Sequence, residues 1–232
     1  MIARAYRKAV ITVGGNPALL RAMAFLWKSI PYGPRRLVTA LFIKFVLWEK
    51  RVLKVDEQDE LTPEKDLGSL AYWGVPDFDL QEFRLNIDGA VGQPLSLSFD
   101  ELRSQPYTER EVRMDCVGGF RNNSVMAGLA VQPLLDRAEV SPEARRAVFH
   151  CADGYYVSIE LSDLLEKDPF LAYAINGQGV PKFGLPLRLA IPGKYGYQWA
   201  KWIVRVEVVT DQRKGYWAAL GLPDRGDVGD IW

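Results

Sequence analysis

The pattern of apolar residues changes at Glu82, and this change constrains the fold more than any other feature of the sequence. Before it, apolar residues recur with the spacing of one helix face. These residues are Leu37, Leu41, Phe45, Trp48, Val52 and Val55. After it, short alternating stretches are separated by turn residues such as Asp88-Gly89. We therefore expect an α+β fold, in which a helical N-terminal extension precedes a body of mostly β mixed sheets with short helices.

Local patterns assign individual elements within the body. The expected strands and hairpins are 83–91, 110–116, 147–161, 187–192 and 201–209. The expected short helices are 97–104, 128–138 and 161–167. Ser98 or Asp100 is the expected cap of the first of these helices, and Ser162 is expected to begin the last. Asn176-Gly177 predicts a turn.

Composition divides the chain into three sections. Residues 1–55 are basic and apolar, with one turn cluster at Pro31–Pro34, which predicts two helices flanking that break. Residues 56–82 are first acidic and then rich in glycine, proline and aromatic residues, so we expect a linker or an extended wrap. Residues 83–232 are the expected functional domain.

Charge is distributed unevenly, although the formal net charge of the 232 residues is zero. Residues 1–54 contain eleven Lys or Arg and one acid, Glu49, which gives +10. The remainder contains 18 basic and 28 acidic residues, which gives −10. The basic arm has two interpretations. Its apolar residues either enter the headgroup region of an anionic membrane, or they pack on the body while its basic groups pair with acids there. We expect no nucleic-acid partner.

Several kinds of site and location are excluded. Two cysteines, Cys116 and Cys151, make no disulfide framework, and the single histidine, His150, is too few for a structural zinc site. His150 lies in an apolar run and is expected to be a strand residue. The chain lacks an apolar span of about 20 residues. Its N-terminus lacks the features of a cleavable signal peptide. We therefore expect a cytoplasmic protein, peripheral at a membrane if the arm binds lipid.

Cys116 is the first candidate for chemistry. It ends a predicted strand and precedes Gly118, Gly119 and Arg121. A loop with nearby positive charge favours a thiolate, which is both a nucleophile and a soft metal ligand. The alternative is a small buried apolar residue beside a turn.

The second candidate is the segment 183–203. Its basic residues Arg188, Lys194 and Lys201 are interleaved with glycines. Basic side chains and glycines that let the backbone approach closely suit a phosphate or another anion. Neither the dinucleotide fingerprint nor the P-loop is present.

Taken in order, these stretches resemble the molybdopterin-binding domain of the sulfite oxidase family. The resemblance runs from about Phe83 to Tyr216. It is carried by "FRLNIDGAVGQPLSLSFDELRS", "MDCVGG", "VFHCADGYYVSIEL", "LAYAINGQGVP" and "GLPLRLAIPGKYGYQWAKWIVRVEVV". It implies that the cofactor is molybdenum–molybdopterin (Mo-MPT).

The resemblance also implies roles for individual residues. Cys116 matches the cysteine whose thiolate binds molybdenum, and Arg121 is the candidate catalytic cation near it. Arg188 matches the arginine that contacts the phosphate end of the pterin. The segment Trp199, Ala200 and Lys201 matches the one that also holds the phosphate, and Cys151 falls near the cofactor or is a core cysteine.

The expected function is therefore that of a molybdenum–molybdopterin oxidoreductase. It would transfer an oxygen atom to or from a small oxyanion, sulfoxide or N-oxide and exchange electrons with a separate redox protein. The alternative is a catalytically inactive or cofactor-free binding module of the same fold, either free or tethered to a membrane. Phe183 stands where relatives carry a polar residue, and the entry loop offers only Tyr72 and Trp73 as pterin contacts. Both features favour the alternative.

Overall fold

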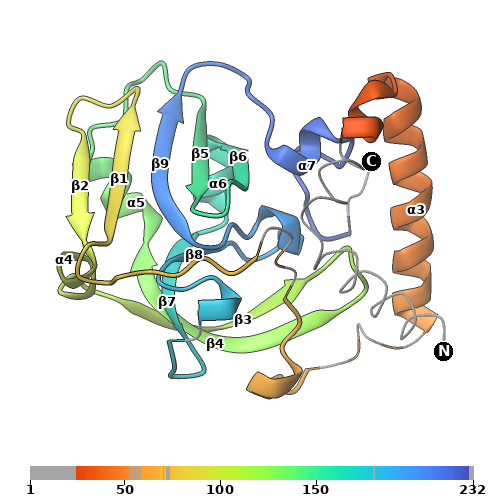
Figure 1. Ribbon diagram of the computed structural model, residues 1–232, viewed down its shortest axis with the longest axis horizontal. Coiled ribbons are helices and arrows are strands. Elements are labelled where there is room, and N and C mark those ends of the chain that lie inside the picture. Colours follow the sequence, from red (N-terminus) through yellow and green to blue (C-terminus); the bar gives the residue numbers. More distant parts are fainter. Residues whose placement is uncertain are drawn as a thin grey trace.

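The computed structural model describes residues 25–52, 54, 57, 59–69, 71, 74–179 and 181–229, so the predictions for Val55, Tyr72 and Trp73 lie outside it. Two β-sheets form the body, and helix α3 (Tyr32–Val52) stands along one side of them (Figure 1). Strands predominate and the helices described in the body are short, which confirms the expected fold class. In the described part of the chain, no helix is long and apolar enough to cross a membrane.

The larger sheet has five strands in the order β2-β1-β9-β5-β6. These are β1 (Arg84–Gly89), β2 (Leu95–Ser98), β5 (Arg146–Cys151), β6 (Tyr156–Glu160) and β9 (Ile203–Val209). β9 pairs in parallel with β1 and antiparallel with β5. The last strand of the body therefore lies between its first strand and the predicted hairpin of β5 and β6. That hairpin is confirmed, since Arg146 lies opposite Glu160. His150 is a strand residue whose Nε2 lies 2.9 Å from Glu207 Oε2.

The smaller sheet has four strands in the order β3-β4-β7-β8. These are β3 (Thr108–Asp115), β4 (Arg121–Ala130), β7 (Phe170–Ile175) and β8 (Arg188–Ala190). The helix predicted at 128–138 is wrong at its start, because β4 continues to Ala130 and helix α5 covers Val131–Arg137. Gly128 to Ala130 pair instead with β7, about 40 residues further along the chain.

Turn and cap residues position the short elements. Ser98 is confirmed as the cap of helix α4 (Phe99–Arg103), because its Oγ accepts the Glu101 N–H at 3.2 Å while the Glu101 carboxylate accepts the Ser98 N–H at 2.7 Å. Helix α6 (Leu161–Glu166) has Glu160 as its N-cap, so the assignment of Ser162 as its start is wrong. The turn at Asn176-Gly177 is confirmed, since both residues have a positive φ.

The main hydrophobic core combines buried side chains from both sheets. From the larger sheet it takes Leu85, Ile87, Phe149, Val157 and Val206, and from the smaller sheet Met126, Leu129, Phe170, Leu171 and Leu189. Cys116 and Cys151, at the ends of β3 and β5, belong to the same core. The two cysteines are therefore held by the packed body and not by a mobile surface loop.

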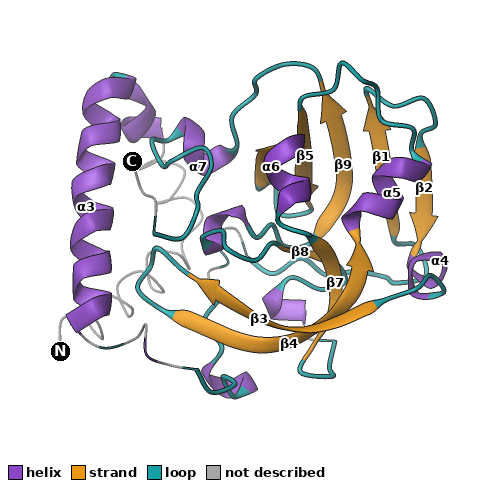
Figure 2. Cartoon of the chain, turned by 180° about the vertical axis from the view of Figure 1, so that it is seen from behind, coloured by secondary structure: helices purple, strands orange, loops and turns teal. Residues whose placement is uncertain are grey.

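Helix α3 packs on the body with one face and is exposed on the other. Ile43 is buried with Tyr195, Tyr197 and Leu222. The residues on the outward side are Leu37, Leu41, Phe45, Trp48 and Val52. Figure 2 shows the helix at the edge of the molecule, near helix α7 (Tyr216–Ala219). The break expected at Pro31–Pro34 is wrong in its extent, because the chain leaves helical conformation only at Ile30 and Pro31, and Tyr32, Gly33 and Pro34 form the first turn of α3.

Residues 59–69 run along the start of β4 and include one short 3₁₀ helix, η2 (Glu64–Asp66). The Thr62 N–H donates to the Asn123 carbonyl at 2.8 Å, and the Asn123 N–H donates to Thr62 Oγ1 at 3.0 Å. Gly68 and Asn122 exchange two further hydrogen bonds, of 2.9 and 2.8 Å. These bonds bring Ser69, the next residue, to the body.

Candidate functional site

Cys116 lies in a tight turn between β3 and β4. Its N–H donates to the Phe120 carbonyl at 2.9 Å, and the Gly119 N–H donates to the Cys116 carbonyl at 3.1 Å. Gly119 has a φ of +83°, which favours glycine. The Gly118 N–H points to Cys116 Sγ at 3.3 Å. The two glycines thus turn the chain and direct an N–H group at the sulfur.

Opposing effects act on the Cys116 thiol. Burial raises its pKa to about 11, while the Gly118 N–H and the charges of Lys201 and Lys50 favour the thiolate. The sulfur therefore keeps its proton unless a cation takes the place of that proton. A metal ion is such a cation, since a coordinating thiol is deprotonated.

Asp115, the residue before Cys116, is held by two cations. Arg121 donates to it through Nε at 3.0 Å and through Nη2 at 3.1 Å. Lys50 of α3 forms a buried ion pair with the same carboxylate. Burial opposes the charged carboxylate, yet hydrogen bonds from Arg121 and Lys50 bring the pKa of Asp115 below its usual value. This cluster fixes the start of the Cys116 turn and connects it to α3.

Arg188 and Lys201 lie opposite each other in an isolated antiparallel bridge at the edge of β8. Gly184 lies against both side chains, with a φ of +108°. A Cβ on Gly184 would come within 2.6 Å of Lys201 Cγ and 3.1 Å of Arg188 Cβ. Only glycine therefore leaves room for this pair of cations.

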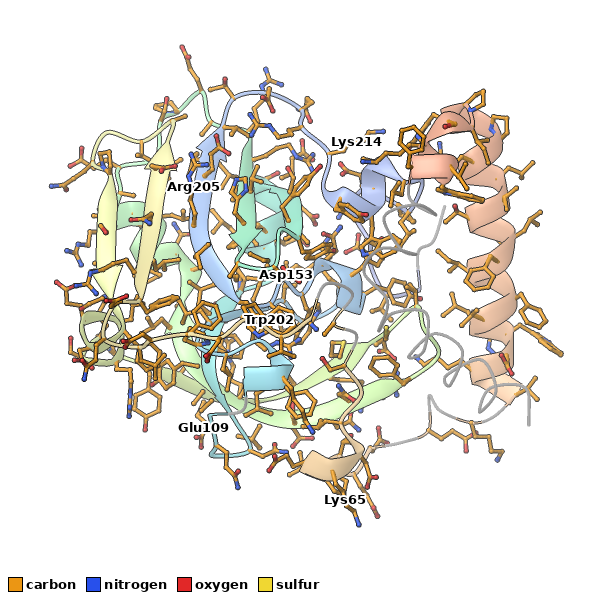
Figure 3. All side chains as sticks on the ribbon, in the orientation of Figure 1. Lys65, Glu109, Asp153, Trp202, Arg205 and Lys214 are labelled. Carbon is orange, nitrogen blue, oxygen red and sulfur yellow. The ribbon has the colours of Figure 1, made fainter. Side chains whose placement is uncertain are left out.

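Lys201 interacts electrostatically with residues of both candidate segments. Burial and then Arg188 lower the pKa of Lys201 to about 7, and Asp153, Cys151 and Cys116 act in the opposite direction. The Lys201 Nζ donates to Ser69 Oγ at 3.0 Å. Asp153 and Trp202, neighbours in sequence of Cys151 and Lys201, lie in the middle of the molecule (Figure 3). The structure thus brings together Cys116, Cys151, Arg188 and Lys201.

These residues fit the anionic end of a pterin cofactor. Arg188 is buried, and its burial lowers its pKa to about 10. Its Nη1 donates to the Phe183 carbonyl at 2.8 Å, but its buried Nε has no hydrogen-bond partner among the described residues. A buried donor without a partner is costly. A phosphate would both accept from this group and offset the repulsion between Arg188 and Lys201.

The remaining predicted cofactor residues surround this pair. Trp199 is buried, and its Nε1 donates to the Lys194 carbonyl at 2.9 Å. The Ala200 carbonyl accepts the Leu189 N–H at 2.8 Å. Burial raises the pKa of Cys151, whose sulfur accepts a hydrogen bond from the Lys201 backbone. Cys151 thus contacts Lys201 directly, while Trp199 and Ala200 fix the segment that precedes it.

Lys194 does not join this cluster, in contrast to the prediction that grouped it with Arg188 and Lys201. Its fully buried ammonium group lies 2.5 Å from Asp163 and 2.8 Å from Asp227. Both carboxylates come from other parts of the chain, so the local sequence could not reveal this pairing. Lys194 ties α6 to the C-terminal segment.

Sequence reasoning missed three residues that the structure adds to the site. They are Lys50, Ser69 and Asp153. Asp153 follows Cys151 closely and faces Lys201, so its position in the "CADG" turn was a usable signal. Lys50 and Ser69 come from segments distant in sequence, and only the folded chain brings them to the site.

Comparisons with known proteins agree with this geometry. The family described as "Oxidoreductase molybdopterin binding domain" matches residues 72–217. An uncharacterized oxidoreductase of Bacillus subtilis, YuiH, is 31% identical over 151 residues, which cover 64% of this chain and 76% of that protein. Human mitochondrial sulfite oxidase is 28% identical over 191 residues, which cover 69% of this chain and 35% of that protein.

A solved structure shares the fold. The sulfane dehydrogenase SoxCD of Paracoccus pantotrophus superimposes with a TM-score of 0.62 at 25% identity, covering 66% of this chain and 45% of that chain. This chain thus spans less than half the length of SoxCD and of human sulfite oxidase. The family match includes Cys116, Cys151, Arg188 and Lys201, and the family's cofactor is molybdenum–molybdopterin. The chain therefore belongs to the molybdopterin-binding oxidoreductase family that includes sulfite oxidase.

Proposed function

We propose that this chain transfers an oxygen atom to or from a small sulfur or nitrogen oxo compound. The observation that supports this most directly is the convergence of the Cys116 thiol with Arg188 and Lys201. A soft sulfur donor beside two cations suits molybdenum held by a pterin that carries a phosphate. When bound, this cofactor supplies the redox chemistry, and the protein binds it, orients it and tunes it.

Each residue of the site has a proposed task. Cys116 supplies a thiolate ligand to molybdenum, and the Gly118 N–H stabilises the negative charge on sulfur. Arg188 and Lys201 bind the phosphate, Cys151 accepts from the Lys201 backbone, and Trp199 and Ala200 fix the segment that leads to Lys201. Arg121 orients Asp115, because two of its nitrogens donate to that carboxylate. We propose that its contribution to catalysis is through the Cys116 turn.

A sulfur compound is the favoured substrate class. The similar proteins described above include a sulfite oxidase and a sulfane dehydrogenase, and both names refer to sulfur compounds. Oxidation of sulfite adds an oxygen atom from water and releases an electron pair. Reduction of a sulfoxide consumes an electron pair and releases that oxygen as water. In either direction, we propose a separate redox protein as the electron donor or acceptor.

Turnover by the molybdenum-loaded protein tests this function. Sulfite would be offered with an oxidised dye, and methionine sulfoxide, an N-oxide or nitrate with a reduced dye. We expect turnover with a sulfur compound, and its loss in Cys116→Ser while circular dichroism stays unchanged. A loaded protein that is inactive with every compound would favour an inactive module of the same fold. The buried and apolar side chain of Phe183, which offers no polar contact to a pterin, is the observation behind that alternative.

A further inference from the structure

The outward side of α3 is the largest concentration of exposed apolar side chains in the described structure. Among the described residues, sixteen large hydrophobic side chains are exposed, and eleven of them lie within residues 25–52. We call five of these the outer face of α3, namely Leu37, Leu41, Phe45, Trp48 and Val52. They are 51–61% exposed. Contiguous apolar surface of this kind marks an interaction site more often than an ordinary exterior.

The outer face cannot turn inward, because the opposite side of α3 is anchored. Lys50 is buried in its ion pair with Asp115, and Ile43 packs on Tyr195. Val46 lies 3.4 Å from the position that a Cβ on Gly119 would take. Rotation of the helix would extract the Lys50 ammonium from its carboxylate, which is strongly unfavourable. A partner that covers the outer face therefore comes from outside the body.

The charges around this face indicate what covers it. Lys44 and Arg51 are exposed and lie seven residues apart, so they form one row beside the apolar residues. Lys28 and Lys54 are exposed beyond the two ends of α3. Glu49 is the single acid from Met1 to Lys54, and it is partly shielded. Apolar residues flanked by long basic side chains suit the interface of an anionic bilayer.

The body adds a second electrostatic contribution. Residues 1–54 carry +10 and the remainder carries −10. From Phe25 to Lys54 alone, seven residues are Lys or Arg and one is acidic, so an anionic surface attracts the side that carries α3 and repels the acidic rest, which selects one orientation. An uncharged apolar partner would gain nothing from this arrangement.

We propose that the outer face of α3 docks on the surface of an anionic lipid bilayer, with the helix lying in the plane of the interface. This goes beyond the proposed reaction, because it determines where the reaction takes place. Lys50, on the inner side of the same helix, contacts the residue before Cys116. A helix is about 10 Å across, so the Cys116 turn faces the membrane side of the molecule. Docking would thus hold the site near a membrane-bound electron carrier.

Flotation of the full chain with lipid vesicles tests this proposal. We expect binding to vesicles of phosphatidylglycerol and phosphatidylcholine, weakened by salt, and little binding to pure phosphatidylcholine. Phe45→Gln combined with Trp48→Gln should weaken binding about tenfold or more, because both rings leave the interface. Lys44→Gln combined with Arg51→Gln should weaken it on anionic vesicles and reduce its salt dependence.

A matched control is available on the body. Leu80 and Tyr107 are 47% and 64% exposed, so Leu80→Gln combined with Tyr107→Gln removes comparable apolar surface away from α3 and should leave binding unchanged. Molybdenum content equal to wild type verifies that each variant is folded, and this readout is independent of turnover. Wild type that does not bind anionic vesicles, or a Phe45/Trp48 variant that binds like wild type, overturns the proposal. Self-association that is lost in that variant would assign the face to a second copy of the chain, which also overturns it.

Discussion

Two neighbouring cations inside a protein are costly, and Arg188 and Lys201 are such a pair. Burial lowers the pKa of both residues, and Arg188 lowers that of Lys201 further. Gly184 permits the arrangement because it has no Cβ. Asp153 offsets part of the repulsion. The buried Arg188 Nε, which has no partner in the described part of the chain, indicates that an anion completes the site.

At the residue scale, we predict that Arg188→Ala and Lys201→Ala lower pterin occupancy far more than they lower the Tm of the cofactor-free protein. Charge-assisted hydrogen bonds contribute about 1.5–3 kcal/mol each, so binding of the pterin should weaken about tenfold to a hundredfold. Acid-released pterin fluorescence measures occupancy. Arg205→Ala is the control, because Arg205 pairs with Asp88 on β1, away from the site. Full occupancy with a loss of substrate affinity would instead assign both side chains to the substrate pocket.

Among the elements, α3 has the most unusual combination of contacts. One side carries a buried lysine that reaches the Cys116 turn, and the other carries the exposed outer face. The family match begins at residue 72, so this helix lies outside the matched segment. Its contacts with Asp115 and Tyr195 nevertheless make it part of the site.

At the element scale, we predict that Lys50→Ala lowers the free energy of unfolding by about 3 kcal/mol, because it breaks a buried ion pair. Molybdenum retention should also fall. Of the two cations described at Asp115, Lys50 and Arg121, this variant keeps only Arg121. Lys54→Ala is the matched control. Lys54 and its partner Glu57 are exposed, so the change should stay within about 0.5 kcal/mol. Urea denaturation measures both values, and equal effects of the two variants would contradict the role of Lys50.

Local signals in the sequence predicted much of the molecule. Ser98 forms the expected cap, Asn176-Gly177 forms the expected turn, and 147–161 forms the expected hairpin. Each depends on residues only a few positions apart. The continuation of β4 to Ala130 depends instead on pairing with β7, which overrides the local helical pattern.

The same contrast between local and long-range signals applies to the site. The sequence predicts Cys116, Arg188 and Lys201 as site residues because each lies in a short motif that resembles those of the family. Lys194 is similar to Lys201 in sequence, but Asp163 and Asp227 take it into a different ion-pair network. Lys50 reaches Asp115 across 65 positions, and a distance of that kind leaves no local pattern.

At the scale of the whole molecule, we propose that the body holds molybdenum through Cys116. X-ray absorption at the molybdenum edge, on protein from a molybdopterin-competent host, tests it most directly. We predict molybdenum and pterin in wild type, one sulfur ligand fewer or loss of the metal in Cys116→Ser, and unchanged coordination in Cys151→Ser, the other buried cysteine. Wild type without molybdenum, or Cys116→Ser with the sulfur coordination of wild type, would contradict the account.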